Sequence, residues 1–580
     1  MPRFAALDVG SNALRLRIIE ASAPSRAAAQ RVQLPLLPIE KETPTGWKEL
    51  LSLRAPVRLG SEVFVTGRLA PASIGQACTA LREFRQAMDA AGVDAYRATA
   101  TSAVREASNG ATLVERARRE AGIELEVIEG VEEARLIQLA VVRRLQLEDR
   151  RAILVDVGGG STELTFMDHG QSVFAMSLPL GTVRLLETFL RSAATVTLGA
   201  VDRGRTKLIG ETIERALAEA LPHLRNIKFE VMVGTGGSVE TMADLCPSCA
   251  SANLARGIDV PAMRTLIGRL SAMTTAERRD TYNLRPDRAD TIVPAASIFL
   301  KAAEAFDVAS IAVPGAGLKE GILEELVDKH FDVWDEEEEA CRVLDNCVRL
   351  GRRFQFDEPH GQLVSQMAAQ LFDDLQPVHA FGPRERLLLQ AAALLHDVGD
   401  FVRYDAHHKH SYYLIQHSDI MGLTPEERAI VANTARYHRK SVPDVSHSNF
   451  RDLSKESRGK VRGLAAILRI ADALDREHRG KVQSVRAEIE QETRTLRVLI
   501  TGADDRELEE WTVQHKSELL RDVFDLEVAL APEPASGRPD THSTPPAPSG
   551  VTKLGDGAAS LQRPASRPKP AEPKKRAGNA

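Results

Sequence analysis

The chain has 580 residues, of which 43% are hydrophobic and 27% charged, proportions typical of folded globular proteins. This length exceeds what one hydrophobic core supports, so we expect several domains. A formal net charge of −6 excludes a global attraction to nucleic acid or to an anionic membrane, and we expect neither as a partner. No apolar stretch reaches the roughly 20 residues that span a bilayer, and the first eight residues lack a signal-peptide core, which predicts a cytoplasmic protein.

Strands and helices alternate through roughly the first 330 residues. The apolar patterns predict, in chain order, strands over 4–8 and 14–20, a surface excursion over 21–50, a helix over 71–92, a strand over 96–100, a helix start at 101–107, a strand over 123–128 and a helix over 129–145. A strand, a turn and a helix recur around Asp156 and around Gly234, and a last glycine turn lies at Pro314-Gly315-Ala316-Gly317. Such alternation favours an α/β fold with mixed sheets.

Two glycine turns of the same type follow apolar runs about 150 residues apart. They are Asp8-Val9-Gly10-Ser11-Asn12 and Asp156-Val157-Gly158-Gly159-Gly160-Ser161-Thr162. Glycine lets the backbone approach phosphate oxygens closely, and the amide groups of such turns then cradle the anion. The leading carboxylates, Asp8 and Asp156, are ligands that Mg²⁺ accepts. The two turns therefore predict a cleft that grips one polyanion from both sides, with phosphate bound by Gly10, Ser11, Asn12, Gly158, Gly159, Gly160 and Ser161.

Six motifs in one order resemble the exopolyphosphatase and guanosine pentaphosphate phosphohydrolase family. They are the two glycine turns, residues 98–107, 129–136 and 179–184, and the turn Gly234-Thr235-Gly236-Gly237. The resemblance covers about residues 3–325. It implies two ribonuclease-H-like lobes of the actin, sugar kinase and heat-shock ATPase superfamily, residues 1–128 and 129–328, around the active cleft. It also implies that Gly236 and Gly237 bind phosphate, in the turn where nucleotide-binding superfamily members hold the nucleoside.

Hydrolysis of a terminal phosphoryl group needs a carboxylate beside the attacking water and positive charge on the phosphoryl oxygens. The resemblance assigns the carboxylate to Glu133, with Glu132 as the alternative, and Arg105 can contact the phosphoryl group through two nitrogens. A solvated helix start is the competing interpretation for both glutamates, because acidic side chains favour the N-terminal end of a helix. We predict a magnesium-dependent hydrolase that removes the terminal phosphate of inorganic polyphosphate or, alternatively, the 5′-terminal phosphate of guanosine pentaphosphate.

Helical periodicity replaces the strands over residues 335–482, which predicts a separate all-helical domain. Ten of the fifteen histidines lie between His360 and His478. The order of His360, His396-Asp397 and Asp472 resembles the ligand order of HD-type metal phosphohydrolases, which implies a second divalent ion such as manganese or iron. Three more histidines can complete another metal position: His407, His408 and His438. A hydrogen-bonded core pair, or a domain that only enlarges the binding groove, is the competing interpretation.

The end of the chain predicts two further segments. Residues 484–503 and 508–529 look like strands and would form a small closing module over 483–530. The segment 531–580 is rich in Pro, Ala, Ser, Gly and Lys, which predicts a disordered tail. The basic run from Arg436 to Lys440 fits either the border of a polyanion groove or a solvated helix end.

Two functions of other classes stay open at this point. The cleft could hold a nucleotide without turnover, in a sensor whose helical half signals the bound state. The helical half could instead be the main enzyme. We expect the protein to form a homodimer.

Overall fold

The computed structural model describes residues 1–23, 46–145, 147, 149–191, 203–224, 227–246, 256–331, 336–502 and 506–532. Most of the excursion predicted at 21–50 and almost all of the tail predicted at 531–580 lie outside the described residues. Among the helices of the described part, none combines the length and the apolar character that crossing a bilayer requires.

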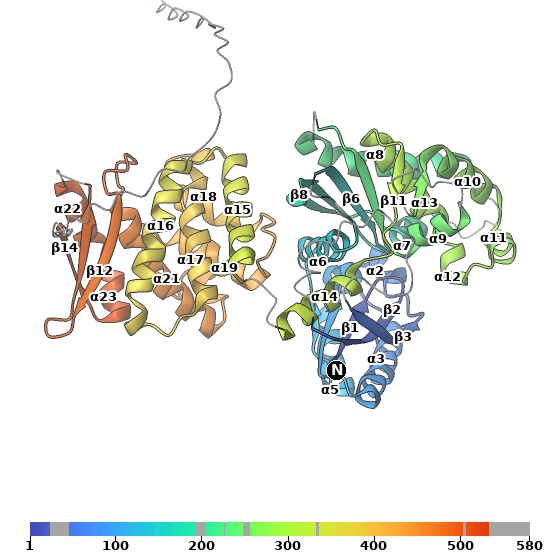
Figure 1. Ribbon diagram of the computed structural model, residues 1–580, viewed down its shortest axis with the longest axis horizontal. Coiled ribbons are helices and arrows are strands. Elements are labelled where there is room, and N and C mark those ends of the chain that lie inside the picture. The colour runs from blue at the N-terminus through green and yellow to red at the C-terminus, as the bar shows by residue number, and fades with distance from the viewer. Residues whose placement is uncertain are drawn as a thin grey trace, which may run out of the picture. The chain divides into compact units, whose positions relative to one another are not determined.

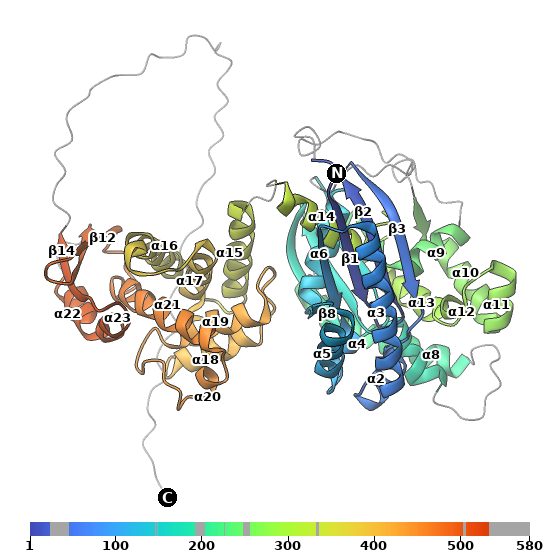
Figure 2. The same ribbon diagram turned by 90° about the horizontal axis from the view of Figure 1, so that it is seen from below.

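The first lobe is built on a five-stranded sheet in the order β3-β2-β1-β4-β5. The strands are β1 Arg3–Val9, β2 Leu14–Ala21, β3 Trp47–Ala55, β4 Ala95–Ala100 and β5 Leu125–Val127. The helices are α2 Gly60–Thr66, α3 Pro71–Ala91, α4 Ser102–Glu106 and α5 Gly110–Ala121. Helices α3 and α5 pack side by side and cover one face of the sheet (Figures 1 and 2).

The second lobe is built on a six-stranded sheet in the order β10-β11-β9-β6-β7-β8. The strands are β6 Arg151–Val157, β7 Thr162–Asp168, β8 Gln171–Leu178, β9 Val231–Thr235, β10 Gly257–Asp259 and β11 Ser310–Ala312. The helices before and beside them are α6 Gly130–Val142, α7 Thr182–Leu185, the π-helical Leu186–Arg191, α8 Arg203–Leu224 and α9 Gly237–Leu245. The later helices are α10 Val260–Ala272, α11 Thr275–Tyr282, α12 Pro286–Ala289, α13 Ile292–Ala305 and α14 Leu318–His330.

The two sheets repeat one topology. The run β8-β7-β6-β9-β11 has the same order as β3-β2-β1-β4-β5, and β10 adds an antiparallel strand at the edge. The registers agree as well, because Asp8 lies opposite Arg15 on β2 and Thr99 on β4. Asp156 lies in the same way opposite Glu163 on β7 and Thr235 on β9. This duplication confirms the predicted two-lobed, ribonuclease-H-like α/β fold.

Strand β1 is apolar along its length because both faces of its sheet are covered. One set of alternate residues belongs to the core beneath α3 and α5, namely Ala5, Leu7 and Val9. The other set packs with α6 and α14, namely Phe4 and Ala6. Successive side chains of a strand point to opposite faces, so Asp8 shares the face of the second set.

Strand β6 follows the same rule. Its residues Ala152 and Leu154 pack with α6, and alternation places Asp156 on their face of the sheet. Both aspartates therefore point to the side covered by α6. This helix begins at Gly130 and carries Glu133 in its first turn.

The third part of the described chain is helical, as the sequence predicts, with one small sheet. Its helices are α15 Glu336–Arg353, α16 Glu358–Asp374, the 3₁₀ turn Gln376–Val378, α17 Pro383–Leu395, the 3₁₀ turn Val398–Phe401, α18 His407–Gln416, α19 Pro425–Arg436, α20 Ser448–Arg451 and α21 Lys455–Ala473. Helices α16, α17 and α21 pack against one another around a single apolar core (Figure 1). The HD-type assignment of this part stays a prediction.

The closing segment differs from its predicted strands. It contains β12 Ser484–Glu490, β13 Thr495–Thr501, α22 Glu507–Lys516, α23 Glu518–Phe524 and β14 Glu527–Pro532, so a strand over most of 508–529 is wrong. Acidic residues fill the first turn of α22, whereas His515 and Lys516 end it, and this charge order favours a helix. Strand β14 also takes the first two residues of the segment predicted to be disordered.

A buried carboxylate on α14 makes the first two lobes sensitive to pH. Glu324 is buried, with one oxygen 3.4 Å from the Trp47 indole nitrogen and the other 3.5 Å from an Arg143 nitrogen. Burial raises the pKa of Glu324 to about 7, although Arg143 opposes the shift. The folded chain therefore keeps a proton that the unfolded chain releases, and stability falls as pH rises from about 4.5 to 7.

We expect Glu324→Gln to remove this pH dependence. The wild-type free energy of unfolding should fall by roughly 3 kcal/mol between pH 5 and pH 8 because of Glu324, at about 1.4 kcal/mol for each unit of pKa. Urea unfolding at the two pH values measures the effect, with the exposed Glu62→Gln as the control. Equal pH dependence in Glu324→Gln and wild type would contradict the assignment.

Candidate active site

The two glycine turns close in the same way. The Gly10 amide donates to the Ala13 carbonyl at 3.2 Å, and the Gly158 amide donates to the Ser161 carbonyl at 3.0 Å. Each turn begins directly after the aspartate-bearing central strand of its lobe. The structural repeat therefore extends from the sheets to the turns at their edges.

The turns of the two lobes face each other. A Cβ atom added to Gly159 would lie 2.9 Å from the Cβ of Ser11 and 3.3 Å from the Asn12 amide nitrogen. On its other side the second turn rests on the start of α7, whose Val183 amide donates to the Gly159 carbonyl at 2.8 Å. A Cβ on Gly181 would lie 2.4 Å from the backbone of this turn, so only glycine allows the contact.

Three carboxylates meet beside these turns. Glu133, Asp156 and Glu163 each have an oxygen within 4.8 Å of an oxygen of the others, and all three are buried. Glu133 comes from the first turn of α6, whereas Asp156 and Glu163 face each other on β6 and β7. Asp8 adds its charge from the first lobe.

Burial and mutual repulsion raise the proton affinity of these groups. Burial and the Glu163 carboxylate raise the pKa of Glu133 well above its usual value. Burial raises the pKa of Asp156 to about 6, although Thr235 donates to it at 2.5 Å. Burial and the charge of Asp156 raise the pKa of Glu163 to about 7. A cation among the three would lower all of these pKa values.

The carboxylates also have the donor atoms that a divalent ion needs. One oxygen of Glu133 and one of Glu163 are buried without a hydrogen-bond partner in the described part of the chain. Unpaired carboxylate oxygens are costly in a protein interior and are the ligands of hard cations. The residues present therefore fit a bound Mg²⁺ ion.

Arginines surround the carboxylates. Arg15 donates to Asp8 at 2.9 Å, and an Arg105 nitrogen lies 3.8 Å from Glu133 while donating to the Ile128 carbonyl at 2.7 Å. Arg288 is buried, and its Nε has no hydrogen-bond partner among the described residues. Burial and the nearby Arg15 lower the pKa of Arg288 to about 10. Such unneutralised positive charge favours a bound anion.

The third glycine turn lies against the second. Gly236 has a φ of 93°, which favours glycine, and a Cβ there would lie 3.5 Å from an Asp156 oxygen. At Gly237 an added Cβ would lie 2.6 Å from an Arg288 nitrogen, and Arg288 also donates to Ser238. The guanidinium therefore covers the turn that the sequence assigns to the nucleoside.

Several predicted residues have protein partners for their side chains. Glu132 lies in an ion-pair network with Arg97 and Arg135, apart from the three carboxylates that include Glu133. Ser11 is hydrogen-bonded to Ser102 at 2.9 Å. The Asn12 side chain accepts from Arg58 at 2.9 Å and contacts Asp287 at 3.4 Å. Because the Ser11 and Asn12 side chains have these partners, the backbone amides are the groups of the first turn that remain for binding phosphate.

Sequence reasoning missed Glu163 and Arg288. Glu163 stands seven residues after Asp156, as Arg15 stands seven residues after Asp8, and this shared spacing is a signal of cross-strand pairing. Glu163 is also followed by four uncharged residues, Leu164 to Met167, and a glutamate beside such a run points to a buried role. Arg288 carries no sequence signal, because only the tertiary fold brings α12 to the Gly236 turn.

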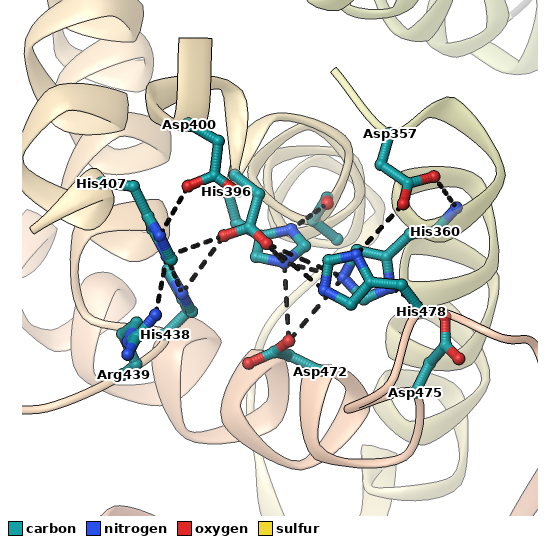
Figure 3. A network of polar contacts seen from close by, with 12 residues as sticks. Asp357, His360, His396, Asp400, His407, His438, Arg439, Asp472, Asp475 and His478 are labelled. Atoms are coloured by element: carbon teal, nitrogen blue, oxygen red, sulfur yellow. Dashed lines mark hydrogen bonds and ion pairs between the residues drawn. The ribbon is translucent and has the colours of Figure 1, made fainter. Parts of the chain in front are cut away.

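The predicted metal ligands of the helical part meet in a second cluster (Figure 3). His360, His396 and Asp472 form one group of mutually close ligand atoms, and Asp397, His407 and His438 form another. Asp397 also groups with His360 and with His478, which the sequence prediction did not include. His408, which it did include, belongs to none of these groups. The pKa of His408 is lowered to about 4 by burial and by the nearby His407.

The protein-family comparison identifies the chain. Residues 39–330 match the Ppx/GppA phosphatase family, and residues 345–522 match domain III of Ppx/GppA phosphatases. The chain belongs to the Ppx/GppA phosphatase family. The family predicted from the motifs is therefore confirmed, and the carboxylate cluster lies within the phosphatase region of the match.

The similar curated proteins align with most of this chain, whereas the similar solved structures align with little more than half of it. The guanosine-5′-triphosphate,3′-diphosphate pyrophosphatase of Aeromonas hydrophila subsp. hydrophila is 24% identical over 506 residues, 85% of this chain and 92% of that protein. The protein of that name from Aliivibrio fischeri is 25% identical over 475 residues, 80% of this chain and 86% of that protein. The Aquifex aeolicus family member is 28% identical and covers 57% of this chain and 98% of its own, with a TM-score of 0.45. An exopolyphosphatase of Cytophaga hutchinsonii is 24% identical and covers 56% and 98%, with a TM-score of 0.48.

We expect Gly181→Ala to lower phosphatase activity at least tenfold. The new methyl group would meet backbone atoms of Gly159 and Gly160 at 2.4 Å and displace the second turn, and misplacement by about 1 Å can cost 100-fold in rate. Phosphate release at saturating and limiting substrate measures the loss. Gly75→Ala on α3 is the control, because its Cβ meets nothing within 4 Å. Unchanged activity in Gly181→Ala would show that the turn does not bind substrate.

Proposed function

We propose that the cleft hydrolyses the terminal phosphoanhydride of inorganic polyphosphate and releases orthophosphate. The observation that carries this proposal is the buried group of Glu133, Asp156 and Glu163 beside two glycine turns that face each other. The turns supply backbone amides for an anion, and the carboxylates supply a metal site and a base. Phosphoryl transfer depends mainly on such positioning and charge.

Each residue has a distinct task in this proposal. Asp8, Asp156 and Glu163 would hold Mg²⁺, which when bound neutralises charge on the phosphoryl oxygens. Glu133 orients the attacking water and takes its proton. Arg105, 3.8 Å from Glu133, contacts the terminal phosphoryl oxygens through its guanidinium.

Polyphosphate is favoured over a nucleotide by Arg288. Its guanidinium covers Gly237, so a guanosine base at this turn would have to displace a buried cation. A further phosphate of a long chain would instead neutralise it. The buried Nε of Arg288, which has no hydrogen-bond partner among the described residues, provides one donor for such a phosphate.

A second candidate is removal of the 5′-terminal phosphate of guanosine-5′-triphosphate,3′-diphosphate. It is supported by the names of the curated relatives, which align over 85% and 80% of this chain. Both substrates present a terminal phosphoryl group to the same carboxylates. The choice between the two substrates therefore depends on the residues of the cleft that contact the rest of the substrate, beyond its terminal phosphoryl group.

We expect Glu133→Gln to lower kcat for polyphosphate hydrolysis 100-fold or more, because a positioned general base contributes at least this factor. Released phosphate is measured with Mg²⁺ in excess. Glu132→Gln is the matched control: it changes the adjacent residue, whose carboxylate binds Arg97 and Arg135, and it should keep kcat within about threefold. A Glu133→Gln rate within twofold of wild type would refute the assignment.

We expect Arg288→Gln to change substrate preference. The amide keeps a hydrogen bond to Ser238 but removes the charge, so kcat/KM should fall about tenfold for polyphosphate and not for guanosine-5′-triphosphate,3′-diphosphate. The wild-type kcat/KM values for the two compounds are measured side by side. Higher wild-type kcat/KM for the nucleotide would establish the second candidate. Binding without phosphate release from either compound would indicate a sensor.

A further inference from the structure

The motif over residues 179–184 ends in an arginine, Arg184, that binds the second glycine turn. Arg184 lies on α7 in the second lobe, and 19% of its side chain is exposed. Its backbone amide donates to the Gly159 carbonyl at 3.1 Å, and its Nε donates to the Gly160 carbonyl at 2.8 Å. The turn therefore holds both the backbone and the side chain of Arg184.

The same guanidinium also reaches the first lobe. Its Nη2 donates to both carboxylate oxygens of Glu106, at 2.6 and 2.7 Å. Its Cζ lies 4.2 Å from the centre of the Phe64 ring, a distance at which an aromatic ring attracts a cation. Glu106 belongs to α4 and Phe64 to α2, which packs against α7 at the boundary of the lobes (Figure 1). One side chain of the second lobe thus contacts two helices of the first.

Helix α4 depends on its surroundings for its position. It has five residues, and a helix of this length is not stable by itself because few hydrogen bonds offset the cost of forming its first turn. At its start, Ser102 is hydrogen-bonded to Ser11, and a Cβ on Gly160 would lie 2.4 Å from the Ser102 hydroxyl oxygen. At its end, Glu106 binds Arg184. The helix is therefore held by close packing at one end and by an ion pair at the other.

Helix α4 also carries Arg105, the arginine beside the carboxylates. Arg105 precedes Glu106 in the chain, and one of its nitrogens is 3.8 Å from Glu133. The backbone amides of Val104 and Arg105 both donate to the Thr101 carbonyl at 3.0 Å, so the backbone of Arg105 follows the rest of the helix. A shift of Glu106 would therefore move the Arg105 guanidinium relative to Glu133.

We propose that Arg184 is a positioning residue for phosphoryl transfer. It holds α4 against the second glycine turn, and it thereby sets the distance between the Arg105 guanidinium and the backbone amides of that turn. This role rests on the proposed function, in which both of these groups bind the phosphate chain. Arg184 acts through Glu106 and not through contact with the substrate.

The role requires two nitrogens of one guanidinium. Nε binds Gly160 of the second lobe while Nη2 binds Glu106 of the first. Because the guanidinium is planar, the angle between these donors is fixed, and each contact constrains the other. A lysine has one nitrogen and can keep the ion pair with Glu106 without the rigid link to Gly160. A methionine keeps the length of the side chain and loses both contacts.

Charge neutralisation is the alternative explanation for the ion pair. Without Arg184, the Glu106 carboxylate would add an unpaired negative charge near a bound polyanion, which weakens binding and raises KM. Misalignment of Arg105 instead lowers kcat, because the transition state depends on alignment more than the bound substrate does. The change in kcat relative to KM therefore distinguishes the two roles.

Steady-state kinetics of single variants test the positioning role. Polyphosphate and guanosine-5′-triphosphate,3′-diphosphate are both assayed, and the variants are compared on the compound that wild type hydrolyses faster. We expect Arg184→Met to lower kcat about 20-fold and to keep KM within about twofold. Arg184→Lys should restore kcat to within about fivefold of wild type. Arg118→Met on α5 is the matched control, because Arg118 is exposed and pairs with Glu115 of its own helix, and it should keep kcat within about twofold.

Double variants test the path through Glu106 and Arg105. Glu106→Ala should lower kcat as much as Arg184→Met, and the variant with both changes should be no slower than either. In an Arg105→Met background, Arg184→Met should lower kcat by less than about twofold further, because the group that it positions has been removed. Equal factors in the two backgrounds would show that Arg184 does not act through Arg105.

Hydrogen exchange gives a readout that does not depend on turnover. The amides of Val104 and Arg105 should exchange about tenfold faster in Arg184→Met than in wild type, because α4 opens more often without its link to Arg184. Mass spectrometry of peptides that span residues 101–107 measures the rates, and Arg118→Met should leave them unchanged.

The outcomes separate this proposal from the proposed function. Wild type that releases phosphate from neither compound, or only from the nucleotide, would count against polyphosphate hydrolysis, and exchange in α4 would still test the role of Arg184. A kcat of Arg184→Met within about twofold of wild type, a rise in KM alone, or unchanged exchange in α4 would overturn that role. Circular dichroism identifies a variant that has not folded, and Arg184→Lys and Glu106→Ala then decide.

Discussion

The cleft depends on one cross-strand pair. Asp156 and Glu163 lie directly opposite each other on β6 and β7, in a sheet that is covered on both faces. Burial and mutual repulsion oppose ionisation of the pair and raise the pKa of Asp156 to about 6 and that of Glu163 to about 7. The neighbouring glycine turns, the Thr235 hydroxyl and Glu133 on α6 are all arranged around this pair. The stored electrostatic repulsion makes the cleft ready for a metal ion and its anionic ligand.

The duplicated lobes use one scaffold for two electrostatic environments. At the position of Glu163, the first lobe has Arg15, which neutralises Asp8 through a direct hydrogen bond. The threonine opposite each aspartate and the closure of each glycine turn are retained. One lobe therefore contributes an internally balanced wall, and the other contributes the excess negative charge. Two lobes of the same topology therefore form a site whose two walls differ in charge.

The helical part also gathers buried polar groups, here mainly histidines. Its histidines have carbonyl or carboxylate partners at Nδ1, and their Nε2 atoms face one another in a buried space, where an Arg439 nitrogen lies 3.2 Å from the Nε2 of His407. The packed core of α16, α17 and α21 holds these rings in place. In both regions the apolar core offsets the electrostatic cost of gathering buried polar groups at one place.

The sequence by itself determined the alternation of strands and helices, the two glycine turns, the family, and the separate helical part, because these follow from local periodicity and from residues close together in the chain. It also led to the predictions that Glu133 and the residues around His396 are site residues. Only the tertiary structure decided that Glu163 completes the carboxylate group, that Glu132 pairs with arginines, and that Arg288 covers Gly237. These relations join residues that are far apart or on neighbouring strands, and register and packing set them. The helices α22 and α23 were predicted to be strands. In short segments of mixed residues the apolar positions fit both helical and strand periodicity, and packing against neighbouring elements decides between the two.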